Sequence, residues 1–229
     1  MLNPPFTLPT PRLTISHLDP TNTTHCAFIT ALIGSPDVVR LNGGVDHGIV
    51  DLAQARTFIA AGVEKLERTG YGRYLVSLRH QGRENGGDAD GDVVADAGQK
   101  EAVEDIPIGV VTMQLARFPC APTIPDLGFA LLPAFYGRGY ATEAAAALVA
   151  YFEQERGVAA FAGYCSAANE ASRAVFRRLG WESWGTRRLE GVKGEGEAGV
   201  LWAEVWTVGV GGEEELGKLG IGGRGEEGG

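Results

Sequence analysis

Segments typical of strands and helices follow one another in an irregular order along this chain. Strand-like runs occupy residues 12–18, 74–79, 106–116, 126–132, 159–166, 183–189 and 200–208. Helix-like runs occupy residues 24–33, 51–70, 140–152 and 170–180. Three consecutive strands separate the second helix from the third, so the chain is not a regular βαβ repeat. This order predicts an α+β fold with a mixed sheet and about four helices.

The segment at residues 51–70 carries the clearest helix signals in the first half of the chain. Asp51 suits the N-cap, where a side-chain oxygen accepts from free backbone N–H groups. Gly70 suits the C-cap, which often has a left-handed backbone. Apolar residues recur between these caps at intervals of three and four, at Leu52, Ala55, Ile59, Val63 and Leu66. The spacing predicts an amphipathic helix.

Length and charge restrict the class of protein. The chain has 229 residues, 44% of them hydrophobic, which suffices for one domain; we place it at residues 10–208. The formal net charge of −9 argues against nucleic acid as a partner. No run of about eighteen apolar residues occurs, and the proline-rich N-terminus is unlike a signal peptide. We therefore expect no membrane partner and a cytoplasmic protein, with the nucleus left open.

Two segments differ in composition from the rest. Residues 81–105 carry eight acidic residues against two basic ones, and such a stretch cannot bury enough apolar surface to fold by itself. Residues 209–229 are nearly half glycine and show no periodicity. We expect a disordered acidic insertion at residues 81–105, between two strands, and a disordered tail at residues 209–229.

The cysteines and histidines are scattered. Three cysteines and four histidines lie far apart, without a C-x-x-C pair or an H-x-x-x-H pair. Metal-binding residues usually show such spacings. The sequence therefore predicts no bound metal, and the cysteines are interpreted as small core residues.

A Gly-Arg-Gly run stands directly before the third helix. Glycine at positions 137 and 139 permits left-handed backbone angles and a close approach of a ligand. Consecutive N–H groups at a helix N-terminus can then converge on an anion, and Arg138 adds a cation. The run indicates a diphosphate site, although a glycine turn that merely starts a helix is an alternative interpretation.

Motif spacing separates the candidate diphosphate ligands. A nucleotide P-loop needs G-x-x-x-x-G-K-[ST], which is absent around this run. A dinucleotide fingerprint needs a third glycine or an alanine where Thr142 stands. A dinucleotide-binding oxidoreductase is therefore disfavoured, and the pyrophosphate of coenzyme A is left as the third candidate.

Two neighbouring stretches carry a resemblance to a known family. They are DLGFALLPAFYGRGYATEA at residues 126–144 and CSAANEASRAVFRRLGWE at residues 165–182. Together they closely resemble the GNAT superfamily of N-acetyltransferases, and within it the branch that acetylates ribosomal-protein N-termini and related amines. The resemblance extends weakly to residues 10–208 through element order. It implies a splayed, mostly antiparallel sheet of six to seven strands, with acetyl-CoA between the fourth and fifth.

The resemblance also implies roles for individual residues. The family's phosphate motif, Gln/Arg-x-x-Gly-x-Gly/Ala, corresponds to residues 136–141, with Tyr136 at the first position. The backbone of the two leucines at 131 and 132 would hold the pantetheine and the thioester, and Asn169 would bond the pantetheine arm. The implied acetyl-CoA site comprises Leu131, Leu132, Gly137, Arg138, Gly139, Tyr140, Ala141, Thr142, Asn169, Ser172 and Phe176.

The residues of the second stretch support this interpretation. Asn169 suits the N-cap of the following helix. Ser172 and Phe176 are four residues apart and share one helix face, which we expect to be free to meet a ligand. Phe176 stands where the family often has a tyrosine acid, and a phenylalanine ring cannot donate a proton.

The chemistry of amine acetylation suggests two catalytic residues. A primary amine is mostly protonated at neutral pH and must lose a proton before it attacks a thioester. Asp126 stands where the family often has a glutamate, and strand alternation places it on one face with Gly128 and Ala130. We predict Asp126 as the general base and Ser172 as the proton donor to the thiolate. A surface aspartate at a strand start is the alternative for Asp126.

Two classes of function stay open at this point. An enzyme that moves acetyl from acetyl-CoA to a primary amine is favoured, and a non-catalytic acyl-CoA-binding module of the same fold is the alternative. A peptide N-terminus, an amino acid, a polyamine and a small-molecule drug are all open as acceptors, although the acidic net charge suits a cationic one. The sequence is compatible with a monomer or a homodimer.

Overall fold

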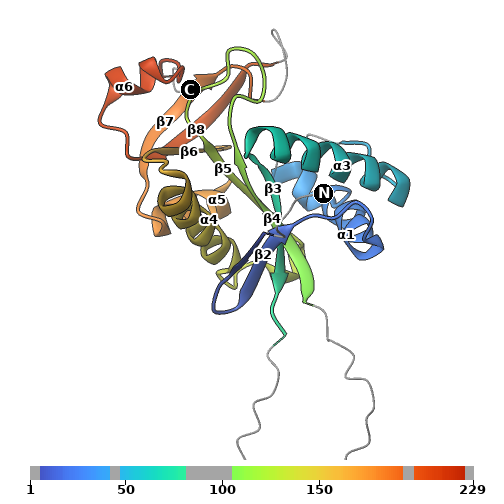
Figure 1. Ribbon diagram of the computed structural model, residues 1–229. Coiled ribbons are helices and arrows are strands. Elements are labelled where there is room, and N and C mark those ends of the chain that lie inside the picture. The colour runs from blue at the N-terminus through green and yellow to red at the C-terminus, as the bar shows by residue number, and fades with distance from the viewer. Residues whose placement is uncertain (1–5, 42–46, 81–104, 193–198, 225–229) are drawn as a thin grey trace, which may run out of the picture.

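The computed structural model describes residues 6–41, 47–80, 105–192 and 199–224. One sheet of eight strands forms its centre, in the order β1-β2-β3-β4-β5-β6-β8-β7 (Figure 1). The strands are β1 (Thr7–Pro9), β2 (Leu13–His17), β3 (Gly72–Leu78), β4 (Ile106–Gln114), β5 (Asp126–Leu131), β6 (Phe161–Cys165), β7 (Glu182–Leu189) and β8 (Leu201–Val208). Only β5 and β6 pair in parallel within the described residues, which confirms the prediction of a mostly antiparallel sheet.

Six helices accompany the sheet in the described residues. They are α1 (Thr23–Ile33), α2 (Pro36–Leu41), α3 (Leu52–Thr69), α4 (Tyr140–Arg156), α5 (Glu170–Arg178) and α6 (Glu213–Lys218), with a 3-10 turn, η1 (Pro133–Phe135). The four longest are the four that the sequence predicts. After a break at residues 34–36 the sequence indicates more helix or a turn, and the structure forms the short α2 there. The structure adds the short α6, and it adds β1 at the edge of the sheet, where a proline such as Pro9 is tolerated.

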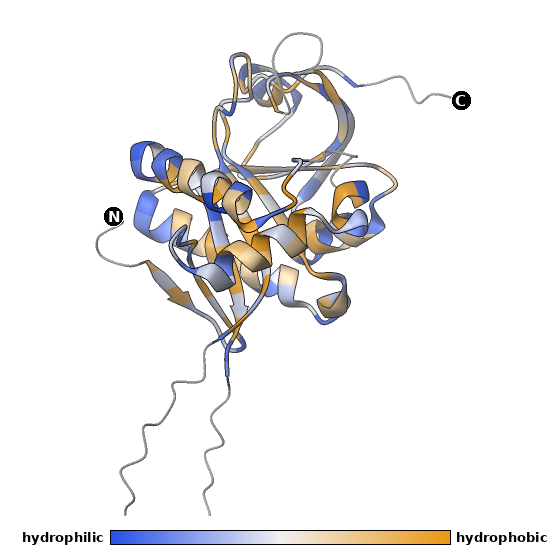
Figure 2. Ribbon diagram, turned by 90° about the vertical axis from the view of Figure 1, so that its right-hand side faces the viewer, coloured by the Kyte–Doolittle hydropathy of each residue, from blue (hydrophilic) through white to orange (hydrophobic). Residues whose placement is uncertain are grey.

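Two apolar layers hold the helices against opposite faces of the sheet. Tyr74 and Val111 pack with α4 and α5, whereas Leu75 and Val110, their neighbours along β3 and β4, pack with α1 and α3. Figure 2 shows helices with hydrophobic and hydrophilic stretches side by side, as expected for amphipathic elements. Because successive side chains of a strand point to opposite faces, the sheet has one face for each pair of helices.

The neighbouring central strands β5 and β6 separate soon after they begin to pair. The register joins Asp126 to Ala162 and Leu127 to Gly163, and pairing ends there although β5 continues to Leu131. A cleft of about 1540 Å³ opens along this region, lined by residues of β5, β6, α4 and α5. The sheet is therefore splayed where the sequence resemblance implies a cofactor.

The end of the chain is folded where the sequence predicts disorder. Leu216 of α6 and Ile221 are 1% and 3% exposed and belong to a third apolar cluster beside β7 and β8. Both Nη atoms of the buried Arg187 donate to the carboxylate of Glu213, at 2.7 and 2.5 Å. Composition averaged over the tail misses these few residues, so the prediction is wrong for residues 209–224. The acidic insertion, except Asp105, lies outside the described residues.

A glycine in β6 makes room for a large ring of α5. A Cβ on Gly163 would come within 2.3 Å of the ring of Phe176, which stacks on Trp181 at a centroid distance of 5.3 Å. We expect Gly163→Ala to lower the free energy of unfolding by about 1–3 kcal/mol in urea titrations, because the packed ring cannot move aside. Gly62→Ala, inside α3 with open space around it, should instead stabilise by about 0.5–1 kcal/mol. Equal changes in the free energy of unfolding for the two variants would contradict the packing of the Phe176 ring against Gly163.

Candidate active site

The two glycines before α4 have the backbone that the sequence predicts. Gly137 and Gly139 have φ angles of 72° and 79°, in the left-handed region that favours glycine. Gly139 is the N-cap of α4 and lacks a side chain to bind the first backbone N–H groups. The turn therefore leaves the N-terminus of α4 open.

The other long helices begin differently. Side-chain oxygens of Asn22, Asp51 and Asn169 accept from backbone N–H groups at the N-termini of α1, α3 and α5. Among the four longer helices of the described residues, α4 alone has no such cap. Its free donors belong to Tyr140, Ala141 and Thr142. An anion could accept from these groups, as it does at phosphate-binding helix N-termini.

A set of polar contacts, which the sequence analysis did not predict, supports the glycine turn before α4. The carboxylate of Glu143 accepts from Arg12 Nε at 2.6 Å and from Thr10 Oγ1 at 2.6 Å. Arg12 Nη1 also donates to the carbonyl of Arg138 at 2.9 Å, and its guanidinium lies 4.6 Å from the centroid of the Tyr140 ring. Partial burial opposes ionisation of Glu143, but the bonds from Thr10 and Arg12 outweigh it and lower its pKa. Arg12 thus neutralises the carboxylate nearest the turn.

Removal of this neutralising charge should weaken anion binding. We expect Arg12→Gln to raise the Kd for acetyl-CoA by about tenfold, equivalent to about 1.4 kcal/mol, because the carboxylate of Glu143 then repels the diphosphate. Calorimetric titration measures the effect. Adding Glu143→Gln to the variant should restore much of the affinity. A double variant as weak as the single one would contradict this electrostatic explanation.

The backbone of β5 turns alternately toward β4 and toward the gap. The N–H group of Leu132 donates to the carbonyl of Ile108, and its carbonyl accepts from the N–H group of Phe135, both at 2.9 Å. Both backbone groups of Leu132 therefore already have partners within the chain. Leu131 and Phe129 direct their backbone groups away from β4, toward the side where β6 has parted. Alternation along β5 could have predicted Phe129.

The N-terminal end of α5 faces the same cleft. Asn169 is 8% exposed; its Oδ1 accepts from the N–H group of Ser172 at 3.1 Å, and its Nδ2 donates to the carbonyl of Leu41 at 3.4 Å. Ser172 is half-buried and lines the cleft. Phe176 is 1% exposed, with its ring packed against Gly163 and Trp181. Both residues line the cleft, but Phe176 is buried in the packing whereas Ser172 is partly open.

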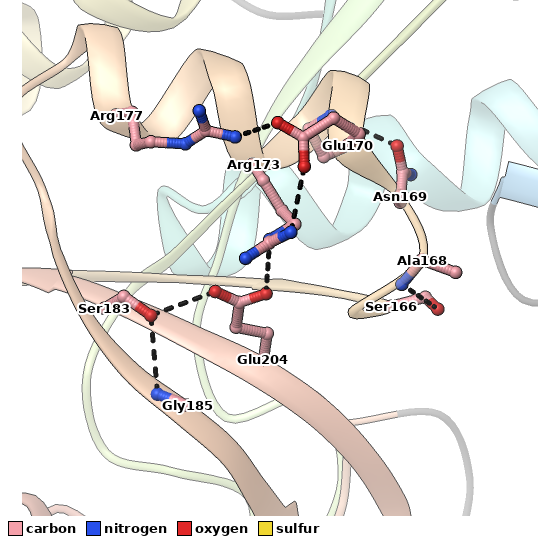
Figure 3. A network of polar contacts seen from close by, with 10 residues as sticks. Ser166, Ala168, Asn169, Glu170, Arg173, Arg177, Ser183, Gly185 and Glu204 are labelled. Atoms are coloured by element: carbon pink, nitrogen blue, oxygen red, sulfur yellow. Dashed lines mark hydrogen bonds and ion pairs between the residues drawn. The ribbon is translucent and has the colours of Figure 1, made fainter.

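A polar network fixes α5 against β8 (Figure 3). Glu170 forms ion pairs with Arg173 and Arg177, and Arg173 Nε approaches the buried carboxylate of Glu204 at 2.7 Å. Glu204 also accepts from Ser183 Oγ at 2.9 Å. The network holds the helix that presents Asn169 and Ser172 to the cleft. The network joins residues that lie far apart in the sequence, so sequence spacing does not predict it.

Asp126 lies inside the cleft and is only 7% exposed. It forms an ion pair with Arg117, from the loop between β4 and β5. Burial raises the pKa of Asp126 to about 6, although the charges of Arg117 and Lys65 act in the opposite direction. The carboxylate is therefore mainly ionised at neutral pH and able to accept a proton. The alternative of a surface aspartate does not fit this burial.

Tyr164 of β6 is a further polar residue of the cleft that the sequence interpretation missed. Its hydroxyl is buried and has no hydrogen-bond partner within the described part of the chain. Burial, and then the charge of Asp126, raises its pKa, so the phenol keeps its proton. Ala162 of β6 stands opposite Asp126, and Tyr164 lies two residues further along β6. Tyr164 and Asp126 therefore share one face of the sheet.

The described residues contain no group of three or more His, Cys, Asp or Glu side chains that could hold a metal ion. Cys26 and Cys165 are buried and unpaired, and Cys120 is exposed and unpaired. Burial raises the pKa of the Cys165 thiol to about 12, so it is not a ready nucleophile. None of the described helices is long and apolar enough to cross a membrane.

The fold and the cleft agree with a family match. The model of the acetyltransferase (GNAT) domain matches residues 12–182. The chain therefore belongs to the GNAT acetyltransferase family, an acyltransferase class, as the sequence resemblance predicted. No curated protein matches the sequence.

Solved structures share the fold at low identity. An acetyltransferase from Agrobacterium tumefaciens is 21% identical over 89% of this chain and 94% of its own, with a TM-score of 0.58. The ribosomal-protein-S5-alanine acetyltransferase from Vibrio fischeri is 12% identical over 89% and 96%, with a TM-score of 0.61. The microcin C7 self-immunity acetyltransferase MccE, solved with acetyl-CoA and AMP, is 15% identical over 87% and 93%, with a TM-score of 0.59.

Proposed function

We propose that this protein transfers the acetyl group of acetyl-CoA to the nitrogen of a primary amine, either a peptide N-terminus or a small molecule. The observation that carries the proposal is the uncapped N-terminus of α4, preceded by two left-handed glycines, at the cleft between β5 and β6. Membership of the GNAT family supports it, as does the acetyl-CoA bound in the neighbour MccE.

The diphosphate of acetyl-CoA would accept hydrogen bonds from the backbone of residues 137–142, with the exposed Arg138 beside it. The pantetheine arm would extend along the free edge of β5 and pair with the backbone of Phe129 and Leu131. Asn169 and Ser172 would border its other side from α5. This path leads the thioester toward Asp126.

The proposed reaction is a direct attack. The amine gives a proton to Asp126, its nitrogen bonds to the thioester carbon, and the bond from carbon to sulfur breaks. The nitrogen, which is cationic in the adduct, then releases its second proton, and the coenzyme A thiolate takes up a proton by way of the Ser172 hydroxyl, the proposed donor, which regains the one that the nitrogen releases. A thiol has a pKa near 8.5, so this last proton transfer is the less demanding of the two.

Thiol release tests the proposal. Purified protein, acetyl-CoA and a panel of primary amines should release free thiol together with an equal amount of acetylated amine, identified by mass. A protein that binds acetyl-CoA but releases thiol with none of the amines would instead be the acyl-CoA-binding module of the same fold. A protein that does not bind acetyl-CoA would contradict both functions.

A further inference from the structure

Three cations line one end of the cleft. They come from three separate elements: Lys65 from α3, Arg73 from β3, and Arg117 from the loop after β4. Asp126 is the acidic residue beside them, whereas Glu143, the other described carboxylate in the lining, lies at the α4 end with Arg12. The end of the cleft opposite the diphosphate site is thus locally basic in a chain of net charge −9.

The strand register places these groups on one face of the sheet. Arg73 stands opposite Thr112, and Gln114, two residues further along β4, stands opposite Asp126. Arg73 and Asp126 therefore share the face that α3 covers. Lys65 of α3 contacts the same face, because its Nζ donates a hydrogen bond to Gln114 Oε1 at 2.7 Å. The basic groups surround the carboxylate proposed as the base.

Asp126 does not neutralise this group of cations. Its ion pair engages Arg117, while Arg73 is half-buried, with its guanidinium 4.5 Å from the centroid of the Phe58 ring and no carboxylate partner within the described residues. Burial, and then the charge of Arg117, lowers the pKa of Arg73 to about 10, which still leaves it charged at neutral pH. One carboxylate among three cations leaves positive charge for a ligand to balance.

We propose that the acceptor is a primary amine that carries an anionic group, a carboxylate or a phosphate, which binds Arg73 and Lys65 while the amine meets Asp126. This inference rests on the proposed function and names its acceptor class. Guanidinium and ammonium groups bind both anions through charge-assisted hydrogen bonds. The same cations repel a polyamine. Local charges prevail over the net charge because salt screens interactions beyond about 8 Å.

Matched acceptor pairs test the inference. We would compare kcat/KM by thiol release for β-alanine against propylamine, phosphoethanolamine against ethanolamine, and the amidated dipeptide Gly-Asp against Gly-Asn. We expect at least one anionic member to exceed its neutral partner by about tenfold or more, since charge-assisted bonds contribute strongly. The pair that responds distinguishes an amino acid, a phosphate ester and an acidic peptide as the source of the anion.

Two variants connect the preference to the site. Arg73→Met should remove most of the preference for the anionic partner, whereas Arg188→Gln, at an exposed arginine of β7 paired with Glu190, should keep it. Neutral amines acetylated as well as, or better than, every anionic partner would overturn the inference and leave the proposed function intact. No acetylation of any amine would overturn the proposed function, and the inference with it.

Discussion

Replacing Gly139 by glutamate is expected to abolish acetyl-CoA binding in a calorimetric titration. Gly139 is the N-cap of α4, and its φ of 79° is one that L side chains rarely adopt. A carboxylate placed about 4 Å from a diphosphate costs about 4 kcal/mol at an effective dielectric constant near 20. We therefore expect the affinity to fall by at least about a hundredfold.

Gly157→Glu is the matched control. Gly157 is the C-cap of α4 and has a similar left-handed φ of 64°, with open space around it. Both variants carry the same added charge and a backbone strain of about 1–2 kcal/mol, but only one lies at the proposed phosphate site. Equal loss of binding in the two would show that strain or unfolding, not the site, explains the effect.

Replacing Asp126 by asparagine should lower kcat by about a hundredfold or more, while acetyl-CoA affinity stays close to that of the wild type. The amide keeps the size of the carboxylate but cannot accept the proton of an amine. Because burial raises the pKa of Asp126 to about 6, only the form present above that pH can act as a base. The wild-type rate should therefore rise as the pH increases through about 6, and the variant should lose this dependence.

Asp126→Glu distinguishes a base from a structural ion pair. Glutamate keeps a carboxylate, so it should recover part of the rate and the rise with pH. Thermal unfolding of both variants checks that Arg117, left without its partner in Asp126→Asn, does not unfold the protein. An asparagine variant with normal turnover, or with an unchanged pH profile, would assign the base to another group.

Local signals predicted most of the fold. Asp51 and Gly70 bound α3 as their capping chemistry predicts, and the two glycines before α4 have the left-handed angles that the phosphate motif requires. The tail was mispredicted because a few residues, such as Leu216, decide its packing and glycine dominates its composition. Averages over a segment do not detect one buried side chain.

The site was harder to predict because it depends on contacts between distant segments. Arg12 lies more than a hundred residues before Glu143, and sequence spacing does not pair them. The basic end of the cleft has the same origin, since Lys65, Arg73 and Arg117 come from a helix, a strand and a loop that meet only in the folded chain. Net charge suggested a cationic acceptor, whereas the local charges favour an amine that also carries an anionic group.

Hydrogen exchange of the backbone amides, with and without coenzyme A, tests the central claim that the gap between β5 and β6 holds the cofactor. Bound coenzyme A should add protection at Phe129 and Leu131 and across residues 139–142, with little change at Leu132, whose amide is already bonded to Ile108. Protection confined to other parts of the sheet, or none at saturating coenzyme A, would contradict it.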